Sequence, residues 1–161
     1  MDTFAGRRLR VVKRALTCKG TPYVPRAYKP GLGLDCGTLL HYVYSAWLPL
    51  PEMPSDYPSD WAMHQVDTRY LDFIKPFVVE VPRPVTGGIS VWQVGCSFSH
   101  AGIRLRDTKK VLHACGRTEF GTVQVAHQGF FNTWGRGEPQ AGRVRPVMHY
   151  DLQPHFWEMV Q

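Results

Sequence analysis

The chain has 161 residues, enough for one domain that buries a hydrophobic core without disulfides or a structural metal. Hydrophobic residues make up 43% of it and charged residues 20%, which excludes a disordered chain, and no apolar run approaches the roughly 18 residues of a membrane-spanning helix. Nineteen basic and thirteen acidic residues give a net charge of +6, which favours polyanionic surroundings but indicates no fold.

Residues 3–17 predict an amphipathic helix whose apolar side packs on the domain. Its basic residues lie on the other face and interrupt any signal-peptide core, so we expect synthesis in the cytoplasm without a secretory signal. Gly20 and Pro22 end this helix. The stretch 22–33 contains three prolines and two glycines and is expected to be a loop.

A second helix is predicted over residues 36–47. Asp35 is a favoured N-cap residue, apolar side chains follow at helical spacing, and Pro49 would end the helix. Further along, residues 59–75 are expected to include a short helix and residues 77–81 a strand.

From residue 85 onward the pattern changes to strands separated by turns. The expected strands are 89–94, 99–105, 111–114, 122–126 and 144–150. The segment 131–142 is rich in glycine and is expected to be a loop. Helices followed by a cluster of strands predict an α+β fold, with N-terminal helices packed on an antiparallel sheet, in a single domain spanning 1–161.

Cys36 is the candidate nucleophile. A cysteine in the first turn of a helix faces backbone N–H groups and the positive end of the helix dipole, and both favour the thiolate, which is the nucleophilic form. The alternative is a small hydrophobic residue buried at a helix start, because free cysteines are often core residues. We expect a lowered pKa for this thiol.

His100 and His113 are the candidate partners of this cysteine. If the strands 99–105 and 111–114 form a hairpin that turns at 106–107, the two histidines lie directly opposite one another on one face. If the helix that begins at Cys36 packs on the same face, His100 can act as a general base and His113 can fix its orientation. A lone histidine on a strand is more often a partly buried residue with no catalytic role, and two facing histidines weaken that alternative.

The other cysteines suggest neither disulfides nor a metal site. No Cys-x-x-Cys pair occurs. Cys96 and Cys115 flank His100 and His113, which raises the possibility of zinc, but their spacings match no common structural zinc pattern. We therefore expect no metal and no cofactor.

Four short motifs carry a resemblance to a known family. They are Gly20-Thr21-Pro22-Tyr23, Asp35-Cys36, Ser99-His100-Ala101-Gly102-Ile103 and His113-Ala114. In order and approximate spacing they resemble the NlpC/P60 family of papain-like cysteine peptidases, from the first helix to about residue 115. The resemblance implies a papain-like NlpC/P60 fold with the catalytic cysteine at a helix N-terminus.

The resemblance also implies a role for each matching residue. Cys36 corresponds to the nucleophile, His100 to the base and His113 to the third, orienting polar residue. Tyr23 corresponds to the tyrosine whose hydroxyl lies near the substrate and the oxyanion site. The backbone N–H of Cys36 would be the other oxyanion donor, which its place at a helix start also favours.

Two further positions are implied to border the substrate, namely Asp35 and Ser99. The alternative for Asp35 is a plain N-cap. The chain departs from the family pattern after the cysteine, where Gly37 and Thr38 replace the usual serine and glycine. It also departs at 24–28, where the family usually has a tryptophan-glycine-glycine stretch, so the substrate subsites are expected to differ more than the catalytic residues.

The activity implied is that of a thiol protease, a cysteine endopeptidase that hydrolyses peptidoglycan stem peptides through an acyl-enzyme. The segment 48–87, inserted between the catalytic helix and the sheet, is longer than in compact cell-wall members. With Tyr57-Pro58 and Asp60-Trp61 it resembles the version carried by tail proteins of phages and gene-transfer agents. This implies a virion tail protein that degrades the cell wall at genome delivery, with tail hub or tip proteins as partners.

Two other classes of function remain open at this point. The fold could persist as a structural tail-tip module with weak or no peptidase activity. The positive charge alone would allow a nucleic-acid binder, but basic and aromatic residues are not interleaved as single-strand binders require, so we expect no nucleic-acid partner.

Overall fold

The computed structural model describes residues 3–54, 69–95, 97–116, 121–133 and 144–161. Two helices come first, as predicted: α1 (Phe4–Leu16) and α2 (Cys36–Tyr44). The side chain of Thr3 caps α1 by accepting a hydrogen bond from the Gly6 N–H at 3.1 Å. α2 ends earlier than expected, and its last turn continues into a tight turn closed by the Trp47 N–H on the Tyr44 carbonyl at 3.0 Å.

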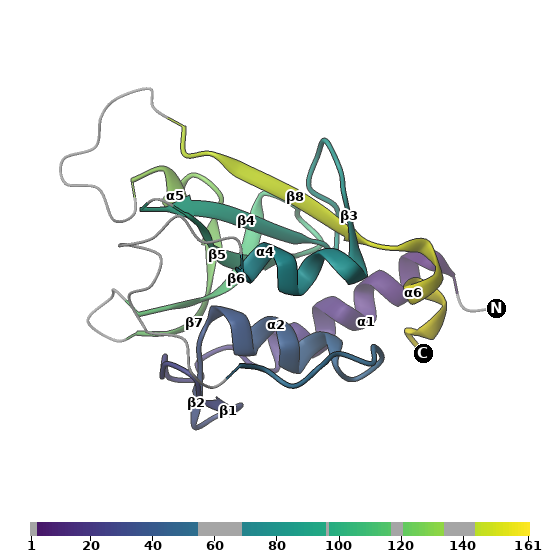
Figure 1. Ribbon diagram of the computed structural model, residues 1–161, viewed down its shortest axis with the longest axis horizontal. Coiled ribbons are helices and arrows are strands. Elements are labelled where there is room, and N and C mark those ends of the chain that lie inside the picture. The colour runs from purple at the N-terminus through teal and green to yellow at the C-terminus, as the bar shows by residue number, and fades with distance from the viewer. Residues whose placement is uncertain (1–2, 55–68, 96, 117–120, 134–143) are drawn as a thin grey trace.

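The remaining elements form a sheet with short helices around it. β1 (Tyr28–Lys29) and β2 (Gly33–Leu34) pair within the segment expected to be a loop. The main sheet has six antiparallel strands in the order β3-β8-β4-β5-β6-β7 (Figure 1). These strands are β3 (Val78–Glu80), β4 (Ile89–Val94), β5 (Ser97–Arg104), β6 (Lys110–Cys115), β7 (Thr122–His127) and β8 (Val147–Leu152).

The short helices differ most from the sequence expectation. α4 (Arg69–Ile74), followed by the 3-10 turn η1 (Lys75–Phe77), confirms a helix in the second half of 59–75, and residues 59–68 lie outside the described residues. α5 (Phe130–Thr133) begins in what was expected to be a loop, and α6 (Pro154–Met159) was not expected. Both are short, with four and six residues, too few for their apolar spacing to show a helical period.

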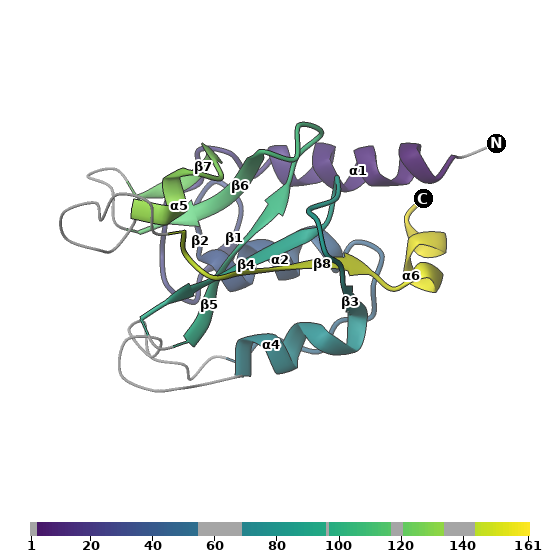
Figure 2. The ribbon, with the colours of Figure 1, turned by 90° about the horizontal axis from the view of Figure 1, so that it is seen from above.

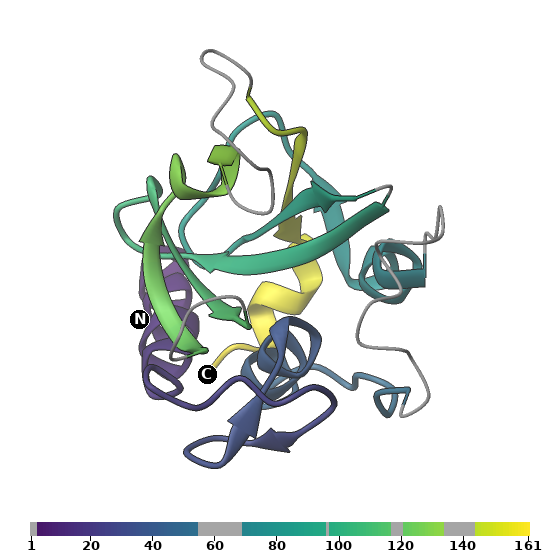
Figure 3. The same cartoon turned by 90° about the vertical axis from the view of Figure 1, so that its left-hand side faces the viewer.

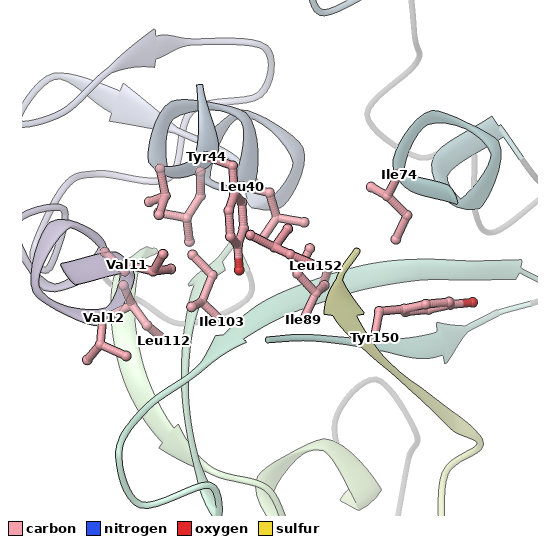
Figure 4. Close-up of a cluster of buried hydrophobic side chains, with 14 of the residues drawn as sticks. Val11, Val12, Leu40, Tyr44, Ile74, Ile89, Ile103, Leu112, Tyr150 and Leu152 are labelled. Carbon is pink, nitrogen blue, oxygen red and sulfur yellow. The ribbon is translucent and has the colours of Figure 1, made fainter. Parts of the chain in front are cut away.

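The helices α1, α2 and α4 lie across one face of the main sheet (Figures 2 and 3). Side chains from α1 and α2 meet the inner face of β5 and β6, with Val11, Leu40, Ile103 and Leu112 among them (Figure 4). A second, smaller cluster lies on the other face beneath α5 and is formed by Trp92, Val111 and Phe131. The mixed α+β arrangement with helices on an antiparallel sheet is therefore as predicted.

The C-terminal helix α6 is held against the start of α1. Arg8 forms a salt bridge with Asp151 at 2.5 Å, and its guanidinium lies 4.5 Å from the ring centroids of both Phe4 and Trp157. The Arg7 guanidinium donates to the Trp157 carbonyl at 3.2 Å. Within the described residues, no helix is long and apolar enough to cross a membrane.

Candidate active site

The candidate site lies where two neighbouring strands of the sheet separate. Backbone pairing between β5 and β6, both fully described, is limited to Ile103↔Leu112 and Arg104↔Val111. On its other side, β5 pairs with β4 from Ser97 to Ile103, with a register shift between Trp92 and Gln93 that leaves Ser99 without a ladder partner. β5 and β6 therefore diverge over residues 97–102, and a gap opens in the backbone pairing between them.

Cys36 lies at this gap. Its thiol donates a hydrogen bond to the Ser99 carbonyl at 3.6 Å, and the Ala101 backbone also hydrogen-bonds to the sulfur. The Arg104 N–H donates to the Gly88 carbonyl just before β4 and the Leu105 N–H to the Lys110 carbonyl of β6, so alternation directs the backbone groups of Ala101 toward the β6 side. The thiol therefore occupies the edge of β5 that β6 has left.

His100 and His113 bridge the two strands across the gap. Nε2 of His100 lies 3.1 Å from Nδ1 of His113, and the two rings are nearly perpendicular at 87°. The structure thus brings the two histidines together, but the expected register is wrong. The observed ladder, if continued, places Gly102 and not His100 opposite His113. His113 reaches His100 diagonally past Gly102, where an added Cβ would lie 3.2 Å from the His113 Cβ.

The expected packing face of the catalytic helix is also wrong. Leu39 of α2 packs in the same core cluster as Ile103, which lies on the inner face of β5. The ring of His100 lies 5.7 Å from that of Phe131, which belongs to the outer cluster. Cys36 therefore approaches the histidine pair through the gap between the strands and not across one face of the sheet.

Aromatic side chains enclose the two histidines on the outer face. Phe131 stacks on Trp92 with ring centroids 3.9 Å apart, and it lies 4.8 Å from the His113 ring. Phe130 lies 5.7 Å from His113. Only 5% of His100 and none of His113 is exposed. Sequence reasoning missed this enclosure, because Phe130 and Phe131 lie at the start of a segment that reads as a glycine-rich loop.

Arg145 holds the enclosing aromatic residues in place. It is 3% exposed, its Nε donates to the Phe131 carbonyl at 2.7 Å, and its Nη1 donates to the Gln93 carbonyl at 2.5 Å. Its backbone N–H donates to Asn132 Oδ1 at 3.2 Å. No motif marks this residue in the sequence, and only the folded chain brings it near the site.

Burial sets the protonation states of the site. Burial first, and the Asp35 carboxylate second, raise the pKa of Cys36 to about 12 against the opposing backbone hydrogen bonds. Burial lowers the pKa of His100 well below its ordinary value, and positive charge on His113 and Arg145 lowers it further. Burial also lowers the pKa of His113 to about 4. The expectation of a lowered thiol pKa is therefore wrong, and near neutral pH the resting site holds a neutral thiol beside neutral imidazoles.

Tyr23 lies within electrostatic reach of the thiol, and its place beside the substrate and the oxyanion site stays a prediction. Its ring packs on Gly116 at the end of β6, where an added Cβ would lie 2.6 Å from Tyr23 Cε1. Burial raises the pKa of Tyr23, and negative charge on Cys36, Asp35 and Cys115 raises it further. This coupling places the phenol within electrostatic reach of the nucleophile.

Asp35 is a buried helix cap. Its Oδ1 accepts from the Thr38 N–H and its Oδ2 from the Arg26 N–H, both at 2.8 Å, while the Thr38 hydroxyl completes a capping box. The N-cap role is confirmed, and a border with the substrate stays a prediction. Ser99 turns its hydroxyl to the Ser97 carbonyl at 3.3 Å, so its backbone carbonyl and not its hydroxyl contacts the thiol.

Two of the remaining cysteines, Cys18 and Cys115, lie within the described residues. Cys18 and Cys115 are buried, and Cys96 lies outside the described residues. In the part of the chain that the structure describes, no three histidine, cysteine or acidic side chains gather as metal ligands would.

The sequence matches no protein-family model and no curated protein. Among solved structures, the fold is similar to the crystal structure of the NlpC/p60 domain of the peptidoglycan hydrolase SagA, with a TM-score of 0.53 and 18% sequence identity. The likeness covers 88% of this chain and 96% of that domain. The chain has the papain-like NlpC/p60 fold.

Proposed function

We propose that this protein is a cysteine hydrolase that cleaves an amide bond in peptidoglycan stem peptides. One observation carries the proposal: the Cys36 thiol contacts the backbone immediately before His100, whose Nε2 lies 3.1 Å from His113 Nδ1. We assign these groups, which come from three elements, as a nucleophile, a base and a group that orients the base. The fold of a peptidoglycan hydrolase domain supports the substrate class.

The reaction begins with a neutral thiol. Sγ of Cys36 attacks the carbonyl carbon of the amide while its proton moves to Nδ1 of His100, and His113 holds the Nε2 side of that ring. The C–N bond breaks as His100 gives the proton to the leaving amine, which leaves an acyl group on sulfur. Water then attacks the thioester and gives a proton to His100, the C–S bond breaks, and His100 returns that proton to the sulfur, which restores the thiol.

The developing oxyanion is stabilised by donors at the start of α2. The backbone N–H of Cys36 projects from the first turn of the helix, where the dipole is positive, and we assign it as one donor. We assign the Tyr23 hydroxyl as the other, because burial raises its pKa and keeps it protonated as a donor.

The test measures release of peptide fragments from purified peptidoglycan and from a synthetic stem peptide, by chromatography and mass spectrometry. Cys36→Ala should lower turnover by at least about a thousandfold because the acyl intermediate forms on the Cys36 sulfur. Cys18→Ala, which removes a buried thiol beyond α1, is the matched control and should retain turnover. Full activity of folded Cys36→Ala would contradict the proposal.

The tail-associated role and the virion location stay predictions from the sequence. Co-purification with phage tail hub or tip proteins would test them independently of catalysis. Wild-type protein that binds such partners, stays folded and releases no fragments would favour the structural tail-tip module instead.

A further inference from the structure

A strained turn lies next to the residue that precedes the nucleophile. The Ala27 N–H donates to the Val24 carbonyl at 3.2 Å, with Pro25 and Arg26 between them. Arg26 has φ 63°, and among the described residues it is the one non-glycine with a positive φ. A proline followed by a residue of positive φ is the pattern of a type II turn, whose third position favours glycine because an L side chain is strained there.

The turn keeps its shape through backbone contacts that do not involve the arginine side chain. The Arg26 N–H donates to Asp35 Oδ2 at 2.8 Å, and the Val24 N–H donates to the Leu34 carbonyl at 3.2 Å. Gly33 packs beneath the turn, where an added Cβ would lie 2.8 Å from the Cβ atoms of Val24 and Ala27. A glycine would therefore satisfy the same geometry without strain, and the guanidinium is not needed to hold the turn.

Arg26 is anchored next to the nucleophile through its backbone. Its N–H donates to the carboxylate of Asp35, and Cys36 follows Asp35 in the chain. The hairpin β1–β2 continues from this turn. Leu34 of β2 leads through Asp35 into α2, while the Tyr28 hydroxyl of β1 lies 2.7 Å from His41 Nδ1 in the second half of α2. Arg26 is exposed, and within the described residues its guanidinium makes no hydrogen bond or ion pair. It presents an uncompensated cation close to the start of α2.

We propose that Arg26 binds a carboxylate of the substrate peptide and so selects acidic peptides; this rests on the hydrolase function proposed above. A guanidinium matches a carboxylate with two parallel N–H···O bonds, which makes arginine the preferred residue for such recognition. Side chains kept at a conformational cost concentrate at functional sites.

The experiment measures peptide binding by calorimetry in a Cys36→Ala background, so that no turnover is required. The probes are a synthetic stem tripeptide with a free D-glutamate α-carboxylate and the same peptide with an α-carboxamide. The Cys36→Ala protein without further changes, called the parent, should bind the carboxylate probe about five- to tenfold more tightly than the carboxamide probe. Arg26→Gly and Arg26→Ala should bind both probes equally, and Arg26→Lys should keep part of the preference. Lys29→Ala removes another exposed cation on the same hairpin and should keep all of it.

A stability measurement separates recognition from damage to the turn. Arg26→Gly should melt about 2 °C above Arg26→Ala, because only glycine relieves the positive φ. A full carboxylate preference in folded Arg26→Gly, or no binding of either probe by the parent, would overturn the proposal. A parent that keeps the preference while the wild type shows no hydrolysis would reject the hydrolase function alone.

Discussion

Lowering the pH from about 7.5 to about 4.5 should destabilise the protein through its buried histidines. Burial lowers the pKa of His113 from 6.5 to about 4, so in this range the unfolded chain binds a proton at this ring that the folded chain does not. The stability is therefore complete above pH 6.5 and is lost as the pH falls toward 4. At pH 4.5 the loss from His113 alone is about 2.5 kcal/mol, at about 1.4 kcal/mol per pH unit. The pKa of His100 is lowered by burial as well, which adds to this loss.

The free energy of unfolding can be measured by urea titration, followed by tryptophan fluorescence, at several pH values across this range. His113→Gln removes the ionisable ring but keeps an amide that can bond to His100. It should lose about 2.5 kcal/mol less than the wild type between the two ends of the range. His155→Gln, a change at an exposed histidine of α6, is the matched control and should follow the wild type.

The result bears directly on the proposed chemistry. If wild type and His113→Gln lose stability in parallel, His113 is not held neutral by burial, and a neutral imidazole pair cannot be the resting state of the base. A steeper loss in the wild type alone supports the neutral pair, which keeps His100 able to accept the thiol proton well below pH 6.5.

Two other substitutions test how the histidine pair is positioned. Gly102→Ala should cost about 1–3 kcal/mol of stability, because its Cβ would lie 2.3 Å from Val111 Cγ1 and 2.9 Å from the Leu112 carbonyl. Because His113 is displaced, Gly102→Ala should also lower kcat by more than the loss of folded protein accounts for. A kcat that falls only in proportion to the folded fraction would contradict this. Arg145→Met removes a cation that lowers the pKa of His100, so the acidic limb of the kcat/KM profile should move to higher pH. An unmoved limb, with the enzyme still folded, would show that the charge of Arg145 does not act on the base.

The elements that the sequence could predict are those with a complete local signal. α1 shows an apolar stripe, and α2 combines such a stripe with Asp35 as a cap. The main strands lie in segments of alternating apolar and polar residues that are bounded by turn residues. The same cap made Cys36 recognisable as a residue of the first helical turn. The motif around His100 also pointed to a residue that the fold places beside the thiol.

The parts that could not be predicted depend on contacts between distant segments. The β5–β6 register is set by where the strands part and by the missing side chain of Gly102. Placing Gly102 in place of His100 opposite His113 leaves the alternation of both strands unchanged, so the sequence pattern fits either register. Arg145 and Phe131 join the site from a part of the chain with no periodic pattern. Local propensity contains no information on such pairings.

The protonation of Cys36 shows why position alone does not determine reactivity. A helix N-terminus favours a nearby anion by about 0.3–1 kcal/mol. Burial and the Asp35 carboxylate raise the thiol pKa from 9.0 to about 12, which corresponds to on the order of 4 kcal/mol before solvent screening and outweighs the dipole. The residue that caps the helix therefore also opposes ionisation of the nucleophile. Attack then requires the proton to leave as the bond to carbon forms, so His100 acts in the chemical step itself and not by storing a thiolate beforehand.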